Sequence, residues 1–185
     1  ARLADEEARR AEEEAARLAA EEEERRRAEE EARRAAEEAA LSEVLPNADL
    51  VDYWCDPIEE LLDPTPVDLD PLSYPGKTGE VTRGPRGVVA LITPWNYPVA
   101  IPLRTLIPAL LAGNSVVFKP SEITPRSGAL VASLFDDLLP NGVLTLVQGG
   151  ADAGKALCAA AVDLVVFTGS VPTGRAIAVA GAERL

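Results

Sequence analysis

Histidine and methionine are absent from this 185-residue chain, and cysteine occurs only twice. Without histidine, the chain has no Ser-His or Cys-His catalytic pair and lacks the commonest metal ligand. Cys55 and Cys158 lie far apart in no CxxC arrangement, so we expect neither a disulfide framework nor a metal site. Because the chain begins with Ala1 and contains no methionine, we expect an excerpt or a processed chain.

The chain also lacks a surplus of positive charge, since its net charge is −13. The first 40 residues carry 15 acidic residues and 9 arginines, and the remainder carries 16 acidic and 9 basic residues. A nucleic-acid-binding protein needs clustered lysine and arginine to displace counterions from phosphates. We therefore expect no nucleic-acid partner.

No long uninterrupted apolar run is present. Residues 1–30 lack the apolar segment of a secretion signal. Residues 87–118 contain one charged residue, Arg104, but Pro94, Pro98, Pro102 and Pro108 interrupt the run. A membrane-spanning helix needs about 20 mostly uninterrupted apolar residues. We expect a soluble, cytoplasmic protein with no membrane partner.

Residues 1–41 are almost entirely alanine, glutamate and arginine, which favours a long charged helix. An alanine-rich seam with 4-3 spacing is interrupted by Glu22, Arg25 and Glu29, whereas a coiled coil needs large apolar residues there. The segment is either a stiff spacer or weak coiled-coil partner helix, or a solvated helix with no specific role. Acid-to-arginine pairs four residues apart support the helix: Asp5–Arg9, Glu6–Arg10, Glu13–Arg17, Glu21–Arg25, Glu22–Arg26, Glu23–Arg27, Glu29–Arg33 and Glu30–Arg34.

Residues 42–86 are interpreted as a connecting helix followed by a proline-rich linker. Helix-forming residues with Pro46 and Pro57 occupy 42–62, and Trp54 has the character of a docking residue. Residues 63–75 contain four prolines among acidic residues, which predicts an extended connection without regular structure. A short strand is expected at 78–83.

From residue 87 the pattern alternates between apolar β-branched runs and helical segments. This alternation predicts an α/β fold with a Rossmann-like parallel sheet flanked by helices, present only in part over 87–185. Ligands of such sheets bind at the carboxyl ends of the strands. The expected strands are 87–92, 115–118, 143–147 and 164–167, and the expected helices are 98–111, 125–139, 153–161 and 172–185.

Four sequence motifs follow these strands at the expected carboxyl edge of the sheet. They are Thr-Pro-Trp-Asn-Tyr-Pro at 93–98, Phe-Lys-Pro-Ser-Glu at 118–122, a glycine-rich turn at 149–154, and Phe-Thr-Gly-Ser at 167–170 with Gly174 beyond it. Their order and spacing resemble those of the aldehyde dehydrogenase superfamily. The resemblance covers about residues 70–185, or from 42, and residues 1–40 carry none of it.

The resemblance implies a binding site for NAD(P) that lacks the usual GxGxxG motif. Lys119 and Glu122 are implied to hydrogen-bond the adenine ribose, and an ionised Glu122 would repel a 2′-phosphate, so NAD is expected rather than NADP. The helix that begins after Gly169 would direct its positive end toward the pyrophosphate. By this resemblance the cofactor-binding residues are Ile92, Thr93, Pro94, Trp95, Lys119, Ser121, Glu122, Gly149, Gly154, Phe167, Thr168, Gly169, Ser170 and Gly174.

Asn96 resembles the residue of the family that stabilises the oxyanion of the thiohemiacetal; the alternative is that Asn96 caps the helix expected from Pro98. The family also needs a nucleophilic cysteine and a glutamate that activates water. Neither Cys55 nor Cys158 lies in a matching context, and Glu183 lacks the motif that follows the family's glutamate. The chain is therefore expected to carry the cofactor-binding part without the bond-making residues.

Three hypotheses follow. The first is an NAD-dependent aldehyde dehydrogenase that acts on a small-molecule aldehyde, is active only at full length and forms a homo-oligomer. The second is a P-loop NTPase, because residues 149–155 match GxxxxGK, although Ala156 stands where a Mg²⁺ ligand is needed. The third is a non-catalytic scaffold made of a rigid charged helix and a truncated nucleotide-binding domain. Val171, where the family usually has threonine, is expected at most to weaken cofactor binding.

Overall fold

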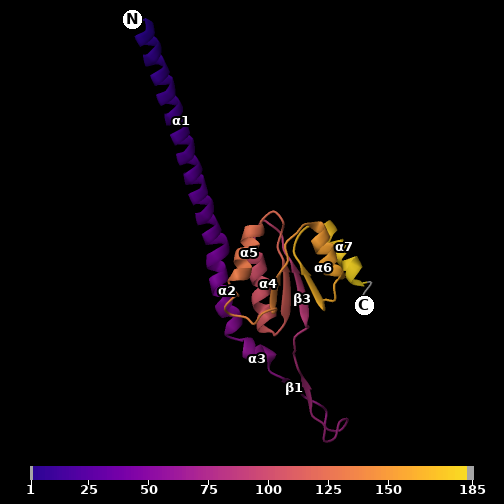
Figure 1. Ribbon diagram of the computed structural model, residues 1–185. Helices are drawn as coiled ribbons and strands as arrows, with labels where there is room; N and C mark the ends of the chain where they lie inside the picture. The colour runs from indigo at the N-terminus through magenta and orange to yellow at the C-terminus, as the bar shows by residue number, and fades with distance from the viewer. Residues whose placement is uncertain (1, 183–185) are drawn as a thin grey trace. The chain divides into compact units, whose positions relative to one another are not determined.

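A computed structural model describes residues 2–182 and divides the chain into two compact units, 1–42 and 43–185. The last three residues of the helix expected at 172–185, including Glu183, lie outside the described residues. Figure 1 shows the elements along the chain. Their bounds are α1 Arg2–Ala39, the π-helical turn η1 Ala40–Val44, α2 Leu45–Cys55, α3 Ile58–Leu62, β1 Thr65–Val67, β2 Gly79–Val81, β3 Val88–Ile92, α4 Ala100–Leu111, β4 Ser115–Lys119, α5 Pro125–Ser133, β5 Leu144–Leu146, α6 Ala151–Ala159, β6 Leu164–Phe167 and α7 Val171–Ala182.

The charged helix predicted at the start of the chain is confirmed as α1, which is 38 residues long. The expected pairs Glu23–Arg27 and Glu30–Arg34 form ion pairs, and Arg25 pairs with Glu29, four residues later. All of these side chains are exposed, so each pair contributes little to the free energy of unfolding. The side chains of residues 1–13 lie outside what the structure describes, and so do the three expected pairs that include one or two of these residues: Asp5–Arg9, Glu6–Arg10 and Glu13–Arg17.

Within the second unit, four parallel strands form one sheet in the order β5-β4-β3-β6. The central strand β3 pairs with β4 and with β6, so Ile92 lies in register with Lys119 on one side and Phe167 on the other. This register brings the carboxyl ends of strands from distant parts of the sequence to one edge. The predicted parallel α/β sheet is confirmed.

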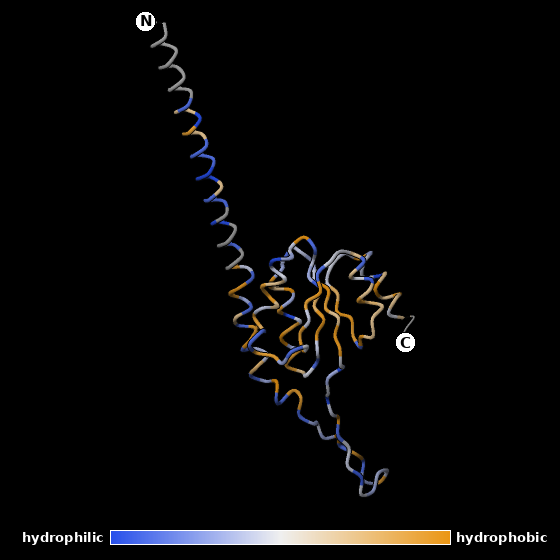
Figure 2. The backbone as a smooth tube through the Cα atoms, viewed as in Figure 1, coloured by the Kyte–Doolittle hydropathy of each residue, from blue (hydrophilic) through white to orange (hydrophobic). Residues whose placement is uncertain are grey.

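The strands of the parallel sheet are mostly hydrophobic (Figure 2), as expected for a sheet that helices cover on both faces. Alternate residues of β3 point to opposite sides. Val89 and Leu91 pack with Leu106 of α4 on one side, whereas Ala90 and Ile92 pack with Leu157 of α6 on the other. Figure 1 shows the same division, with α4 and α5 on one side of β3 and with α6 and α7 on the other.

The segment expected to be a structureless linker contains a strand. β1 pairs antiparallel with β2, and Thr65 lies opposite Val81. Pro66 occupies a two-stranded ribbon, where a strand has an unpaired edge that tolerates the missing N–H. The prediction of no regular element over 63–75 is therefore wrong, because proline density does not exclude an edge strand.

Several expected boundaries also shift. The helix expected to reach residue 139 ends at Ser133, because Phe135 N donates to Ala132 O and Leu138 N to Phe135 O in tighter turns. The helix expected from Pro98 begins at Ala100, and the helix expected at 153–161 runs over Ala151–Ala159. Among the described residues, none of the helices combines the length and apolarity that crossing a membrane requires.

Candidate functional site

A cleft of about 690 Å³ lies at the carboxyl edge of the parallel sheet, between the loops that follow β3, β4 and β6 and the faces of α6 and α7. The structure brings twelve of the fourteen residues implied by the resemblance to this cleft: Ile92, Thr93, Pro94, Trp95, Lys119, Ser121, Glu122, Gly154, Phe167, Thr168, Gly169 and Ser170. Ile92 and Phe167, 75 residues apart in sequence, meet there because parallel strands end at the same edge.

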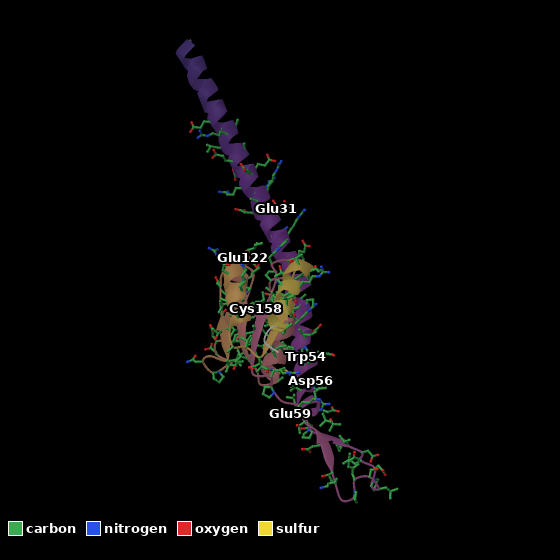
Figure 3. The ribbon with its side chains drawn as sticks, turned by 90° about the vertical axis from the view of Figure 1, so that its right-hand side faces the viewer. Glu31, Trp54, Asp56, Glu59, Glu122 and Cys158 are labelled. Carbon is green, nitrogen blue, oxygen red and sulfur yellow. The ribbon has the colours of Figure 1, made fainter. Side chains whose placement is uncertain are left out.

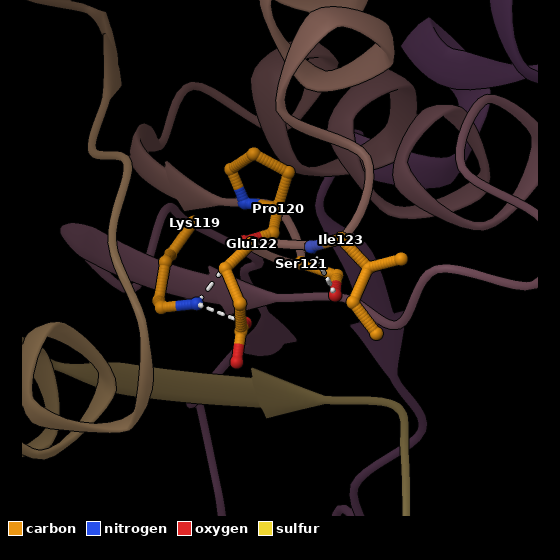
Figure 4. A network of polar contacts seen from close by, with 5 residues as sticks. All are labelled: Lys119, Pro120, Ser121, Glu122 and Ile123. Carbon is orange, nitrogen blue, oxygen red and sulfur yellow. Dashed lines mark hydrogen bonds and ion pairs between the residues drawn. The ribbon is translucent and has the colours of Figure 1, made fainter.

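Lys119 and Glu122 form a charged pair in the cleft (Figure 4), which Lys155 also lines. Lys119 ends β4 and is only 4% exposed, and its Nζ lies 3.7 Å from Oε2 of Glu122. Lys119 Nζ also donates a hydrogen bond of 3.1 Å to Pro120 O. Glu122 is exposed, so its carboxylate is open to a ligand while the lysine is held in place beneath it.

Gly154 of α6 and Gly150, which precedes that helix, lie opposite Lys119 and Glu122. A Cβ added at Gly154 would stand 3.8 Å from Lys119 Cε, and one at Gly150 would stand 3.9 Å from Glu122 Oε1. A methyl group at either position would make ordinary van der Waals contact with the charged side chain and would fill part of the cleft beside it. Gly150 and Ala151, at the start of α6, line the cleft, so the N-terminus of that helix lies at the cleft.

The start of α7 supplies hydroxyl groups and a second helix N-terminus. Ser170 Oγ lies 2.9 Å from Thr173 Oγ1 and accepts a bond of 3.4 Å from Thr173 N. Phe167 lies beneath this turn: a Cβ added at Gly169 would stand 2.5 Å from Phe167 Cζ, so a larger residue there would require the ring to shift. The N-terminus of α7 is therefore placed at the edge of the sheet by close packing on an aromatic ring.

Two implied cofactor-binding residues, Gly149 and Gly174, are not among the residues that line the cleft. Gly149 has a φ of +150° and forms the turn into α6, where a Cβ would stand 2.8 Å from Ala153 Cβ. Gly174 faces the Phe167 ring, since a Cβ there would stand 3.4 Å from Phe167 Cε1. Both glycines shape the walls of the cleft.

Asn96 also lies outside the lining and is exposed, one residue beyond Trp95, which lines the cleft. The alternative that Asn96 caps the following helix is wrong. That helix begins at Ala100, and the carboxylate of Glu43, 56 residues upstream, accepts the N–H bonds of Val99 and Ala100. The structure thus leaves the Asn96 side chain open to solvent.

Sequence reasoning missed the apolar lining of the cleft. Ala176, Ile177 and Ala180 recur at helical spacing on α7, so one face of that helix turns toward the cleft. The helical spacing of these three residues could be recognised in the sequence. The packing of α6 beside the cleft could not, because it depends on the tertiary structure. The further lining residues that are not among the implied cofactor-binding residues are Gly150, Ala151, Lys155, Cys158, Pro172 and Thr173.

Cys158 lies on α6 and is buried (Figure 3), as expected for a small apolar residue in an alanine-rich helix. Burial raises the pKa of the Cys158 thiol. Because the thiolate is the reactive form, we expect Ellman's reagent at pH 8 to modify the exposed Cys55 at least about ten times faster than Cys158. In a Cys55→Ser variant, only the reaction of Cys158 is measured. Equal rates for the two cysteines would contradict the burial of Cys158.

A parallel sheet whose carboxyl edge carries two helix N-termini, a buried lysine and an apolar helix face defines a Rossmann-like α/β domain. A model of the aldehyde dehydrogenase family matches residues 4–185, and the chain belongs to that family. The match begins far earlier than the motifs indicated, because it includes the charged helix.

Proteins of this family share sequence and fold with the chain. The 4,4'-diapolycopene aldehyde oxidase of Methylomonas sp is 43% identical over 140 residues, which cover 75% of this chain and 26% of that protein. The structure resembles the substrate-bound AldH of Staphylococcus aureus with a TM-score of 0.70 and 27% identity, covering 79% of this chain and 32% of the other. An NAD-dependent benzaldehyde dehydrogenase from Corynebacterium glutamicum gives a TM-score of 0.62 and 35% identity, covering 68% and 28%. The chain thus spans about a quarter to a third of these relatives.

Proposed function

We propose that the cleft binds NAD and that the chain is the cofactor-binding part of an enzyme that oxidises a small-molecule aldehyde to a carboxylic acid. The observation that carries the proposal is the meeting of all four motif segments around one cleft, the glycine-rich turn contributing Gly150, Ala151 and Gly154. The C. glutamicum relative named as NAD-dependent supports the same cofactor. We propose no particular aldehyde, since these relatives are named for aldehydes as different as a diapolycopene aldehyde and benzaldehyde.

The residues present fit a dinucleotide. An adenine ring is flat and apolar, and Ala176, Ile177 and Ala180 offer an apolar helix face. Ribose hydroxyls both accept and donate hydrogen bonds, and Lys119 and Glu122 supply a donor and an acceptor side by side. The pyrophosphate is anionic and suits the N-terminus of α7.

We propose NAD over NADP because Glu122 is exposed and anionic where the ribose would lie. A 2′-phosphate placed against this carboxylate would meet like charge. Bound NAD⁺ would accept the hydride of the aldehyde. This chain's own residues would hold and orient the cofactor, and Asn96 would donate its amide N–H to the developing oxyanion.

The thiol nucleophile and the water-activating glutamate are proposed to lie outside this chain, so that aldehyde oxidation belongs to a longer protein. Cys158 does not fit the nucleophile because burial raises its pKa. Cys55 lies on α2, away from the residues that line the cleft. A homo-oligomeric, cytoplasmic enzyme is proposed from the family alone.

The test is a calorimetric titration of this chain with NAD, NADP and ATP-Mg²⁺. We expect weak NAD binding, weaker NADP binding and no ATP hydrolysis. Lys119→Ala and Glu122→Ala should each weaken NAD binding by about tenfold, since hydrogen bonds to charged groups are lost. Glu122→Ala should also reduce the difference between the affinities for NAD and for NADP.

Lys77→Ala and Glu80→Ala remove the same side-chain types at exposed positions and should leave NAD binding unchanged. If the Lys119 and Glu122 variants bind NAD as tightly as the unmodified chain, their assignment to the ribose fails. If the unmodified chain shows no NAD binding at millimolar concentration, the proposed function fails.

A further inference from the structure

The N-terminus of α4 is capped by a buried carboxylate from a distant part of the chain. Glu43 Oε2 accepts hydrogen bonds of 2.8 Å from Val99 N and 3.1 Å from Ala100 N. Glu43 is only 8% exposed, and its own carbonyl accepts a bond from the Asn47 side chain on α2. A negative charge at a helix N-terminus is favourable, and these two N–H groups have no partner within the helix.

The loop 93–99, which carries Trp95 and Asn96, is held at both ends. At its start, Thr93 N donates a bond of 3.2 Å to Lys119 O, which ties the loop to the strand that supplies the charged pair. At its end, Val99 is tied to Glu43. Prolines at 94 and 98 restrict the backbone between these two anchors.

Trp95 is 55% exposed and lines the cleft, and Asn96 beside it is exposed as well. Neither side chain is fixed by deep burial, so their positions depend on the backbone of the loop. Besides Glu43, two backbone bonds from α4 hold the end of this loop: Ile101 N donates to Tyr97 O, and Leu103 N donates to Val99 O. The Thr93 anchor belongs to the sheet edge, whereas the Glu43 anchor depends on a single carboxylate.

We propose that Glu43 is a positioning residue that holds the loop 93–99 so that Trp95 lies against the bound cofactor and Asn96 is directed toward the reacting carbonyl. The inference rests on the proposed function for the roles of Trp95 and Asn96. The anchoring of the loop itself does not depend on it. The proposal requires the reach of the glutamate side chain and one acceptor oxygen, since both N–H groups donate to Oε2.

The experiment uses the emission of Trp95 as a direct readout of the loop. The chain contains two tryptophans, so a Trp54→Phe background leaves Trp95 alone. Within the described part of the chain, the Trp54 Nε1 atom is buried without a hydrogen-bond partner, so phenylalanine removes no hydrogen bond there. Acrylamide quenching of Trp95 without nucleotide and the affinity for NAD are then measured for each variant.

Glu43→Ala and Glu43→Asp should both raise the quenching constant of Trp95 by about twofold and weaken NAD affinity by about three- to tenfold, since a preorganised loop is lost. Aspartate keeps the charge but is one methylene shorter. Glu43→Gln keeps the reach and one acceptor oxygen, so it should restore both values to near those of the unmodified chain. Asp49→Asn, an exposed carboxylate on α2, is the matched control and should change neither.

The proposal is overturned if the alanine or aspartate variant melts at a lower temperature while Trp95 quenching and NAD affinity stay unchanged, since Glu43 would then be only structural. If the alanine variant does not fold, Trp95 quenching and NAD affinity are compared between Glu43→Asp and Glu43→Gln. Equal values for these two variants would likewise overturn the proposal. If the unmodified chain fails to bind NAD, the proposed function falls, and Trp95 quenching alone still tests the anchoring of the loop by Glu43.

Discussion

Leu91→Ala is expected to lower the free energy of unfolding by about 2–5 kcal/mol. Leu91 lies in the central strand β3, is 0% exposed and packs with Leu106, Phe118 and Val131. Truncation removes apolar contacts and leaves a cavity that neither sheet neighbour can fill without moving. A loss of this size is a large share of the 5–15 kcal/mol that stabilises a typical domain.

The decrease in the free energy of unfolding is measured by urea denaturation, monitored by circular dichroism. Leu72→Ala is the matched control, because Leu72 is 92% exposed in the β1–β2 connection. This variant should change the free energy of unfolding by no more than about 0.5 kcal/mol. Equal effects for the two variants would contradict the packing of the sheet on α4 and α5.

Gly128→Ala is expected to destabilise the protein by about 1–3 kcal/mol, although the same change in an open helix is stabilising. Gly128 lies in α5, where a Cβ would stand 2.3 Å from Cγ and 2.5 Å from Cβ of Pro120. A proline ring cannot rotate out of the way. Relief requires α5 to move away from the loop that holds Ser121 and Glu122, so this variant should also weaken NAD binding.

Gly181→Ala is the control for the sign of this effect. Gly181 lies in α7 with open space around the added Cβ, so alanine should stabilise the protein by up to about 1 kcal/mol. Thermal melts of the two variants should therefore move in opposite directions. A rise in melting temperature for Gly128→Ala would show that α5 does not pack on Pro120 as described.

The β/α half of the chain was predictable because its elements are local. The apolar run at 164–167 matches β6 residue for residue, and the runs that became β3 and β4 differ by one residue at one end. A buried parallel strand has to be apolar along its whole length, and this requirement is visible in sequence. The convergence of Lys119 with Trp95 and Phe167 followed from the carboxyl-edge rule alone.

Other features depended on partners distant in sequence. Thr65 pairs with Val81 across 16 residues, and no local signal distinguishes such an edge strand from a linker. The helix start at Ala100 is set by Glu43, and the close approach of Pro120 fixes Gly128. Such contacts arise only when the chain has folded.

The sequence by itself determined the alternation of strands and helices, the charged helix and the four motif loops, because propensity and hydrophobic periodicity act over a few residues. Tertiary structure alone decided which groups became buried partners. It placed Lys119 beneath Glu122, turned an apolar face of α7 to the cleft, and brought the Glu43 carboxylate to the backbone of Val99 and Ala100. Burial and hydrogen bonding across such distances depend on packing, and packing exists only in three dimensions.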